Sequence, residues 1–286
     1  MPPEVSARAR ALLAGEWLAP TLRDAATVML LRQRDTLETY LMRRASTMAF
    51  AAGMYVFPGG RVDDVDLAED LPWVDRVVDG ARMTASAALA RGLVVCAVRE
   101  LFEETGVLLA VDVDGRTPTE DRSWEDDRSA VHASSESLGP VLRRRGLSLD
   151  PELLPLWTHW VTPEIESSRY DVRFFVAAIP PGQQARDVSG EADDVRWIPP
   201  ADALVAYGQG RLPMLPPTVA TLADLTEVAD MEAVRTAAAQ RDVRPLMPRP
   251  RLDAQGDIAW DVIDARDGTV IVRLPAEPAG SEVAGA

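Results

Sequence analysis

The spacing of apolar residues predicts both strands and helices along this chain. Short apolar runs bounded by turn-forming residues indicate strands, and they fall at residues 26–31, 37–42, 54–57, 107–111, 157–161, 172–179 and 195–198. The first two runs would form a hairpin across a polar turn. Helical spacing is clearest up to Thr105, where Thr84 or Ser86 can cap the start of the helix and Gly106 can end it.

The second half of the chain continues the alternation of helix and strand. Leu and Val recur at helical spacing from Pro213 to Arg241, and two apolar runs around Gly268 predict a final hairpin. We expect residues 112–150 to form a loop with short helices, with the Arg143–Arg145 run as a solvated face. From Pro275 onward, small and acidic residues predict a frayed tail.

These elements predict an α/β protein with a mixed sheet between helices. We expect one main domain over residues 22–210, with an acidic surface insertion at about 63–85. Residues 211–286 would add a C-terminal helix and hairpin, which would either pack on the main domain or exchange contacts in a homodimer.

Composition narrows the classes of function. With 286 residues and 47% hydrophobic residues, the chain can bury a large core. We find no apolar run long enough to cross a membrane and no secretory signal, so we expect a cytoplasmic protein. The net charge of −15 argues against nucleic-acid binding through a bulk electrostatic field. Lys is absent, so a cationic phosphate contact must use the forked guanidinium of Arg.

The few cysteine and histidine residues limit the metal chemistry that is available. Cys96 is the single cysteine, and its apolar neighbours predict a packed, inert thiol. The chain has two histidines, and we expect His159, between two tryptophans of a strand, to be structural. Oxygen ligands, and therefore a hard cation, are the main remaining choice.

The most informative segment is a cluster of carboxylates near the end of the predicted helix. Glu100, Glu103 and Glu104 stand at positions i, i+3 and i+4, so their side chains share one helical face. Their charges repel one another, and the helix dipole disfavours them at this end. A divalent Mg²⁺ or Mn²⁺ would compensate, and Arg99 lies one turn before Glu103, where it can orient that carboxylate. The alternative is a solvated, glutamate-rich helix face.

This segment resembles the Nudix box, in which a glycine and a glutamate precede Arg-Glu, an apolar residue, Glu-Glu, glycine and an apolar residue. The positions that match are Arg99, Glu100, Leu101, Glu103, Glu104, Gly106 and Val107, with Gly60 of Phe-Pro-Gly-Gly as the opening glycine. Gly60 precedes Arg99 by 39 positions, about 25 more than in the compact motif. Asp66 replaces the first glutamate when counted from Gly60, whereas Arg91 occupies its place when counted back from Arg99.

The presence of an insertion inside the box resembles one subgroup of the family, the coenzyme A diphosphatases of the peroxisomal type. Arg44, Gly53 and the Phe-Pro-Gly-Gly segment fit the pattern linked to coenzyme A recognition, whereas Ala49 stands where a related pattern has Arg. With further similarity in later strands, the resemblance covers roughly residues 22–225.

The resemblance implies a Nudix α/β/α sandwich that hydrolyses a pyrophosphate bond in a nucleoside diphosphate linked to another group. For coenzyme A, the products would be 3′,5′-ADP and a phosphopantetheine. The implied metal ligands are Glu100, Glu103 and Glu104. The candidate catalytic residues are Glu103, Glu104, Arg99 and Glu191, with either a box glutamate or Glu191 as the base. The candidate substrate contacts are Arg44, Gly59, Gly60, Arg169 and Arg173.

Other functions fit the same residues. ADP-ribose, a nicotinamide dinucleotide or an oxidised nucleotide are alternative substrates, because the box positions metals and says little about the leaving group. A ligand-binding module that has kept the fold and lost catalysis belongs to a different class of function. The acidic insertion could shape a substrate pocket, mediate dimerisation or do neither.

Overall fold

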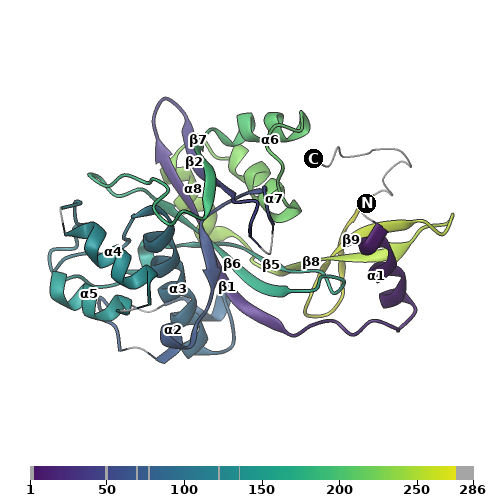
Figure 1. Cartoon of the computed structure of the whole chain (residues 1–286), viewed down its shortest axis with the longest axis horizontal. Coiled ribbons are helices and arrows are strands. Elements are labelled where there is room, and N and C mark those ends of the chain that lie inside the picture. The colour runs from purple at the N-terminus through teal and green to yellow at the C-terminus, as the bar shows by residue number, and fades with distance from the viewer. Residues whose placement is uncertain are drawn as a thin grey trace. The chain divides into compact units, whose positions relative to one another are not determined.

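The computed structural model describes residues 3–48, 51–68, 70–76, 78–121, 123–134 and 136–274 (Figure 1). The predicted frayed tail from Pro275, together with Ala49 and Phe50, lies outside the described residues. The chain forms two compact units, here called unit 1 (1–24, 158–172 and 242–286) and unit 2 (25–157 and 173–241). Three strands contribute residues to both units, namely β1 (Leu22–Gln33), β5 (Leu156–Val161) and β6 (Arg169–Ala178).

The sheet of unit 2 is built around strand β2 (Leu37–Arg44). β2 pairs antiparallel with β1, which confirms the predicted hairpin. β3 (Tyr55–Val56) and β7 (Ala192–Ile198) also pair antiparallel with β2. The short strand β4 (Gly59–Arg61) pairs with β1, so that Gly59 lies opposite Thr27 and Gly60 opposite Ala26. The predicted strands at 26–31, 37–42, 54–57, 157–161, 172–179 and 195–198 are therefore present.

Helix α3 (Ala87–Thr105) begins and ends where its sequence predicts. The Ser86 side chain accepts a hydrogen bond from the Leu89 N–H, and Gly106 ends the helix in the left-handed conformation at φ 77°. The predicted apolar face, which includes Val94, Val98 and Leu101, is buried. α3 is thereby fixed along its length, and its last two turns carry the carboxylates.

Further helices complete unit 2. They are α2 (Asp64–Ala68), α4 (Trp124–His132), α5 (Leu138–Arg145), α6 (Pro200–Gly208), α7 (Pro216–Thr226) and α8 (Met231–Gln240), with 3-10 turns at Gly80–Arg82 and Pro151–Leu153. Residues 211–241, assigned to an extension on sequence grounds, cluster with unit 2. Among the described residues, no helix has both the length and the apolar character needed to span a membrane.

Unit 1 contains α1 (Pro3–Leu13) and a sheet of β8 (Pro245–Leu252), β9 (Ile258–Asp264) and β10 (Val270–Leu274). β9 pairs antiparallel with β8 and β10, which confirms the predicted final hairpin, and β8 pairs parallel with β5. His159 of β5 is buried and paired with Asp171, in agreement with its predicted structural role.

The predicted strand at Val107–Val111 is wrong. This segment is buried, but the only pairing described for it is an isolated bridge from Val111 to Ser148. The Gln183 side-chain amide takes the place of a neighbouring strand, because it accepts from the Leu108 N–H at 2.9 Å and donates to the Leu108 carbonyl at 3.1 Å. Buried backbone groups need hydrogen-bond partners, and the Gln183 side chain supplies them at Leu108 without a neighbouring strand.

Two surface predictions also need correction. Arg144 and Arg145 do not form a simply solvated face, because both pair with Asp127, and the Arg145 guanidinium lies 4.8 Å from the centre of the Trp124 ring. The insertion is not wholly on the surface either. Asp66 of α2 is 3% exposed and faces α3.

Candidate active site

The double-glycine bend brings the backbone of β4 against the carboxylates of α3. A Cβ atom on Gly60 would lie 2.3 Å from the carboxyl carbon of Glu100. One on Gly59, which has φ 154°, would lie 2.3 Å from the Ala26 carbonyl oxygen. Gly59 therefore requires glycine, whereas a side chain at position 60 would have to displace the Glu100 carboxylate, so the bend leaves a backbone cradle beside that carboxylate.

Glu104 is the most deeply buried of the three glutamates, at 5% exposure. One of its carboxylate oxygens accepts a hydrogen bond from the Gly59 N–H at 2.8 Å. Burial first, and then the negative charge of Glu100, raise the pKa of Glu104 well above its usual value. A buried carboxylate held next to another one is short of positive charge.

Glu100 has the same electrostatic problem. Burial raises its pKa to about 7; the nearby Arg99 opposes this shift, whereas Glu103 adds to it. The charge of Glu100 also raises the pKa of Glu104. Because this repulsion is mutual, each of the two carboxylates disfavours ionisation of the other. Such pairs are typical of sites that bind a cation or move a proton.

Arg99 organises this face of α3. Its guanidinium binds Asp66 in a two-pronged ion pair, with nitrogen-to-oxygen distances of 2.9 and 2.8 Å. The same group donates to Glu100 at 2.8 Å and to Glu103 at 3.2 Å. Asp66 is the residue that counting forward from Gly60 put at the first glutamate of the box, and it had no assigned role. The distance in sequence from Gly60 pointed to Asp66. The sequence does not show how the insertion folds, so it could not show that Asp66 pairs with Arg99.

Glu103 shares one guanidinium nitrogen of Arg99 with Glu100 and also faces helix α4. Besides Arg99, its carboxylate lies 3.5 Å from Nδ1 of His132 in α4. Arg128 of the same helix donates to the Glu103 carbonyl at 3.0 Å, and the Trp124 indole N–H donates to the Gly106 carbonyl at 2.8 Å. α4 is thereby locked onto the end of α3, which places His132 at the site. Sequence reasoning missed His132 because nothing local links it to the box.

The loop before β7 reaches the same end of α3. The Val188 N–H donates to the Glu104 carbonyl at 3.4 Å, and the Ala45 N–H donates to the Glu191 carbonyl at 2.8 Å. After burial and Glu100, the charges of Glu191 and Arg44 also act on the pKa of Glu104, Glu191 raising it and Arg44 lowering it. Both candidate residues are therefore within electrostatic reach of Glu104.

The two remaining arginine candidates have partners elsewhere. Arg173 is 4% exposed, and its Nε donates to the Met83 carbonyl at 3.1 Å. Arg169 belongs to unit 1, where it donates to the carbonyls of Thr162 and Pro20 at 3.1 and 3.3 Å. No described contact links either one to the glutamates of α3. Cys96 is a fully buried thiol, as predicted, 3.6 Å from the Gly60 carbonyl.

The donor groups fit a hard divalent cation in chemistry and in charge. Glu100 and Glu104 are carboxylates with raised pKa values, beside a backbone cradle that a Cβ would fill. As the side chains are arranged, no three acidic, His or Cys groups of the described residues are placed to hold one ion together. Arg99 supplies the positive charge that Glu100 and Glu103 need in this arrangement.

The fold and the site define a class of protein in which a glycine bend faces an arginine-organised carboxylate cluster on one helix. Residues 89–225 match the family described as the NUDT19 Nudix domain. A solved structure of a Nudix hydrolase from Alicyclobacillus acidocaldarius is 30% identical, with a TM-score of 0.64, over 76% of this chain and 96% of that one. The chain belongs to the Nudix hydrolase family, whose members hydrolyse pyrophosphate bonds.

Two curated proteins are similar to this chain at lower identity. The chain is similar to an acyl-coenzyme A diphosphatase NUDT19 of Xenopus laevis, at 23% identity over 72% of this chain and 64% of the relative. It is also similar to a putative nudix hydrolase 7 of Caenorhabditis elegans, at 23% identity over 80% of this chain and 68% of that protein. The chain thus spans just under two thirds of the length of the frog relative.

Proposed function

We propose that this protein hydrolyses the pyrophosphate bond of coenzyme A or an acyl-coenzyme A in a reaction that depends on Mg²⁺ or Mn²⁺. The observation that carries the proposal is the pair of carboxylates, buried Glu104 and part-buried Glu100, against the Gly59–Gly60 bend. Each raises the cost of ionising the other, so the site favours a ligand that brings positive charge. The printed name of the frog relative supports coenzyme A as the substrate class.

A bound divalent cation would neutralise phosphate oxygens and lower the pKa of an attacking water. Glu100 and Glu104 would hold it, with Glu103 as a third ligand if it turns from Arg99. The Gly59 N–H keeps Glu104 in place through its hydrogen bond. Arg99, itself held by Asp66, prevents Glu100 and Glu103 from separating under their mutual repulsion.

The substrate and the attacking water need two further groups. Arg44, near Glu104 and carrying a guanidinium, would contact the diphosphate. Glu191, on the loop attached to the end of α3, would take the proton from the water. A box glutamate is the alternative base, and the variants Glu191→Gln and Glu104→Gln separate the two assignments by the size of the loss in kcat.

Initial rates on a panel of substrates test the proposal. With Mg²⁺ or Mn²⁺ present, we expect coenzyme A and acetyl-coenzyme A to be cleaved to 3′,5′-ADP with a higher kcat/KM than ADP-ribose, NADH or an oxidised nucleoside triphosphate. The alternative, an ADP-ribose, NADH or oxidised-nucleotide pyrophosphatase, would reverse that order. Absence of hydrolysis on every diphosphate would favour a ligand-binding module that has lost catalysis.

A further inference from the structure

The hydroxyl group of Tyr40 is a buried hydrogen-bond donor that has no partner. Tyr40 lies in β2 and is 1% exposed. Within the part of the chain that the structure describes, no group forms a hydrogen bond with its hydroxyl oxygen. Leaving a buried polar group unpaired costs free energy, so most such groups in folded proteins are paired and an exception needs an explanation. A donor that is kept for a ligand is one such explanation.

Packing fixes the direction of the Tyr40 ring. Tyr40 lies opposite Trp197 of β7, and the two rings meet edge to face, with centres 5.3 Å apart and planes at 64°. The guanidinium of Arg32 lies 4.4 Å from the centre of the Trp197 ring and is itself paired with Glu38. Because each of these side chains holds the next, turning the Tyr40 ring towards another partner would break the ring contact.

The sheet presents Tyr40 on the face that α3 covers. Opposite Ala26 of β1, the glycine bend is open towards the carboxylate of Glu100, so this face of β1 is directed to α3. Side chains alternate along a strand, so Arg32, six positions after Ala26, shares that face. Arg32 lies opposite Glu38, which precedes Tyr40 by two positions in β2. Tyr40 therefore lies on the same face of the sheet as the carboxylates of α3.

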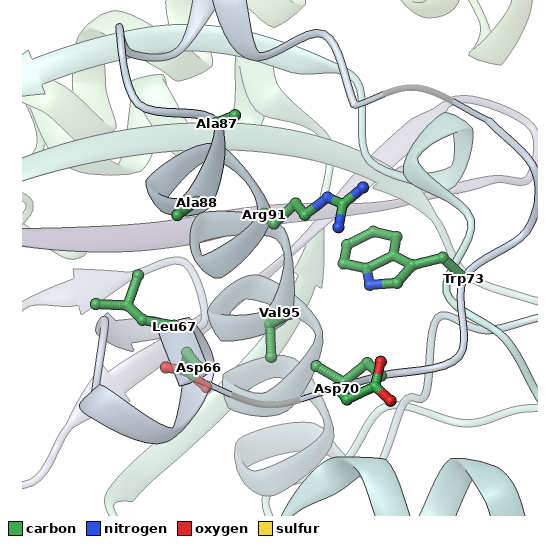
Figure 2. A pocket seen from close by; sticks show the side chains of 9 residues that line it. Asp66, Leu67, Asp70, Trp73, Ala87, Ala88, Arg91 and Val95 are labelled. Carbon is green, nitrogen blue, oxygen red and sulfur yellow. The ribbon is translucent and has the colours of Figure 1, made fainter.

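The carboxylate of Glu104 points from α3 towards this face of the sheet. Figure 2 shows that Arg91 and Val95 line a pocket on the side of α3 that borders the insertion. Nine residues separate Val95 from Glu104, which is roughly two and a half turns at about 3.6 residues per turn. Glu104 therefore points away from that pocket, in agreement with the hydrogen bond that it accepts from the Gly59 N–H.

Two carboxylates act on the Tyr40 hydroxyl without binding it. Burial first, and then the charges of Asp187 and Glu104, raise the pKa of this hydroxyl. Asp187 belongs to the loop before β7, whose Val188 N–H donates to the Glu104 carbonyl. The hydroxyl therefore stays protonated, as a free donor beside negative charge. A cation at Glu104 would offset that charge and bring oxygen atoms that can accept the hydrogen bond.

We propose that the Tyr40 hydroxyl donates a hydrogen bond to an oxygen atom that arrives with a divalent cation at Glu104, either the cation's own water or a phosphate oxygen of the diphosphate. The proposal deepens the function proposed above and rests on it. Glu104 is itself 5% exposed, so a cation that reaches its carboxylate enters the buried layer in which the hydroxyl lies. Tyr40 is then a binding residue that lowers the stability of the free protein and stabilises the complex.

The variant Tyr40→Phe removes the hydroxyl and keeps the ring. Without ligand, its Tm should be no lower than that of the parent, because no hydrogen bond is lost. With Mg²⁺ present, its kcat/KM for coenzyme A should fall about tenfold, as the loss of one hydrogen bond implies. The matched control Tyr207→Phe, at a tyrosine of α6 that is 39% exposed, should change neither value. An unchanged kcat/KM, or a Tm below that of the parent, in Tyr40→Phe would overturn the proposal.

Calorimetry separates the two sources of the oxygen atom and does not require hydrolysis. The probes are Mg²⁺ alone and Mg²⁺ with methylenediphosphonate, a diphosphate analogue whose P–C–P link resists hydrolysis. If the acceptor is the cation's water, Tyr40→Phe should bind Mg²⁺ alone about tenfold more weakly than the parent does. If the acceptor is a phosphate oxygen, only the diphosphonate should bind more weakly.

The same titrations distinguish failure of this proposal from failure of the proposed reaction. If the parent hydrolyses no coenzyme A and Tyr40→Phe still binds either probe more weakly, the reaction fails and the role of Tyr40 stands. If the parent and Tyr40→Phe bind both probes equally, the role of Tyr40 fails whatever the hydrolysis result.

Discussion

The ion pair between Asp66 and Arg99 allows a quantitative test of how the box is completed across the insertion. We predict that Asp66→Asn destabilises unit 2 and lowers kcat. The Asp66 side chain is 1% exposed and the Arg99 side chain 10%, so the pair is well shielded from water. Removing one charge from a buried pair costs roughly 3–5 kcal/mol, because the other charge is left without compensation.

The expected loss lies at the lower end of that range. Arg99 keeps its contacts with Glu100, Glu103 and the Arg61 carbonyl after the substitution. We therefore expect a decrease of about 3 kcal/mol in the free energy of unfolding, measured in urea. For a unit of this size, that corresponds to a decrease in Tm of roughly 6–12 °C.

Asp63 offers a matched control. Its carboxylate lies 3.9 Å from Arg99, but its side chain is 44% exposed and it also pairs with Arg61. Asp63→Asn should cost less than about 1 kcal/mol, as is usual for a surface pair. If Asp66→Asn costs no more than Asp63→Asn and leaves kcat unchanged, then Asp66 does not position Arg99 and the reasoning is refuted.

Three further predictions concern the buried Tyr40 hydroxyl, the close approach at Gly60 and cation binding at Glu104. Tyr40→Phe should raise the free energy of unfolding by about 1 kcal/mol, because the described residues give its buried hydroxyl no hydrogen-bond partner; a decrease in urea titrations would contradict this. Gly60→Ala should lower kcat at least tenfold, since its Cβ would lie 2.3 Å from the Glu100 carboxyl group, whereas Gly208→Ala, with open space around it, should not. Mg²⁺ or Mn²⁺ should raise the Tm of the parent more than that of Glu104→Gln, and equal shifts by scanning fluorimetry would argue against a cation at this carboxylate.

Local signals in the sequence were sufficient for α3 and its carboxylates. The cap at Ser86, the stop at Gly106 and the apolar spacing between them all act within a few turns of one helix. The identity of the family also came from such a short segment. Contacts made by the rest of the chain were not predictable in this way, because they depend on where distant segments pack.

The errors have particular physical causes. Val107–Val111 is as apolar as a buried strand, and nothing local shows that Gln183 satisfies Leu108 in place of a partner strand. β8 was not predicted because it contains Pro245, Pro248 and Pro250, which cannot donate to a sheet. It pairs with β9 nonetheless.

The site shows the same division between local and long-range information. The i, i+3, i+4 spacing placed three glutamates on one face, but it could not show that Glu104 would be buried or that Glu103 would turn to His132. The pairing of Asp66 with Arg99 depends on the path of the insertion, which the sequence left open.

The most direct test of the central claim is the kcat for coenzyme A hydrolysis in three proteins, namely the parent, Glu104→Gln and the control Glu232→Gln. Glu232 is an exposed glutamate in the first turn of α8. If the buried carboxylates of α3 carry out the reaction, Glu104→Gln should lose about 100-fold or more in kcat while remaining folded, and Glu232→Gln should stay within twofold of the parent. Full activity in a folded Glu104→Gln variant would contradict the account.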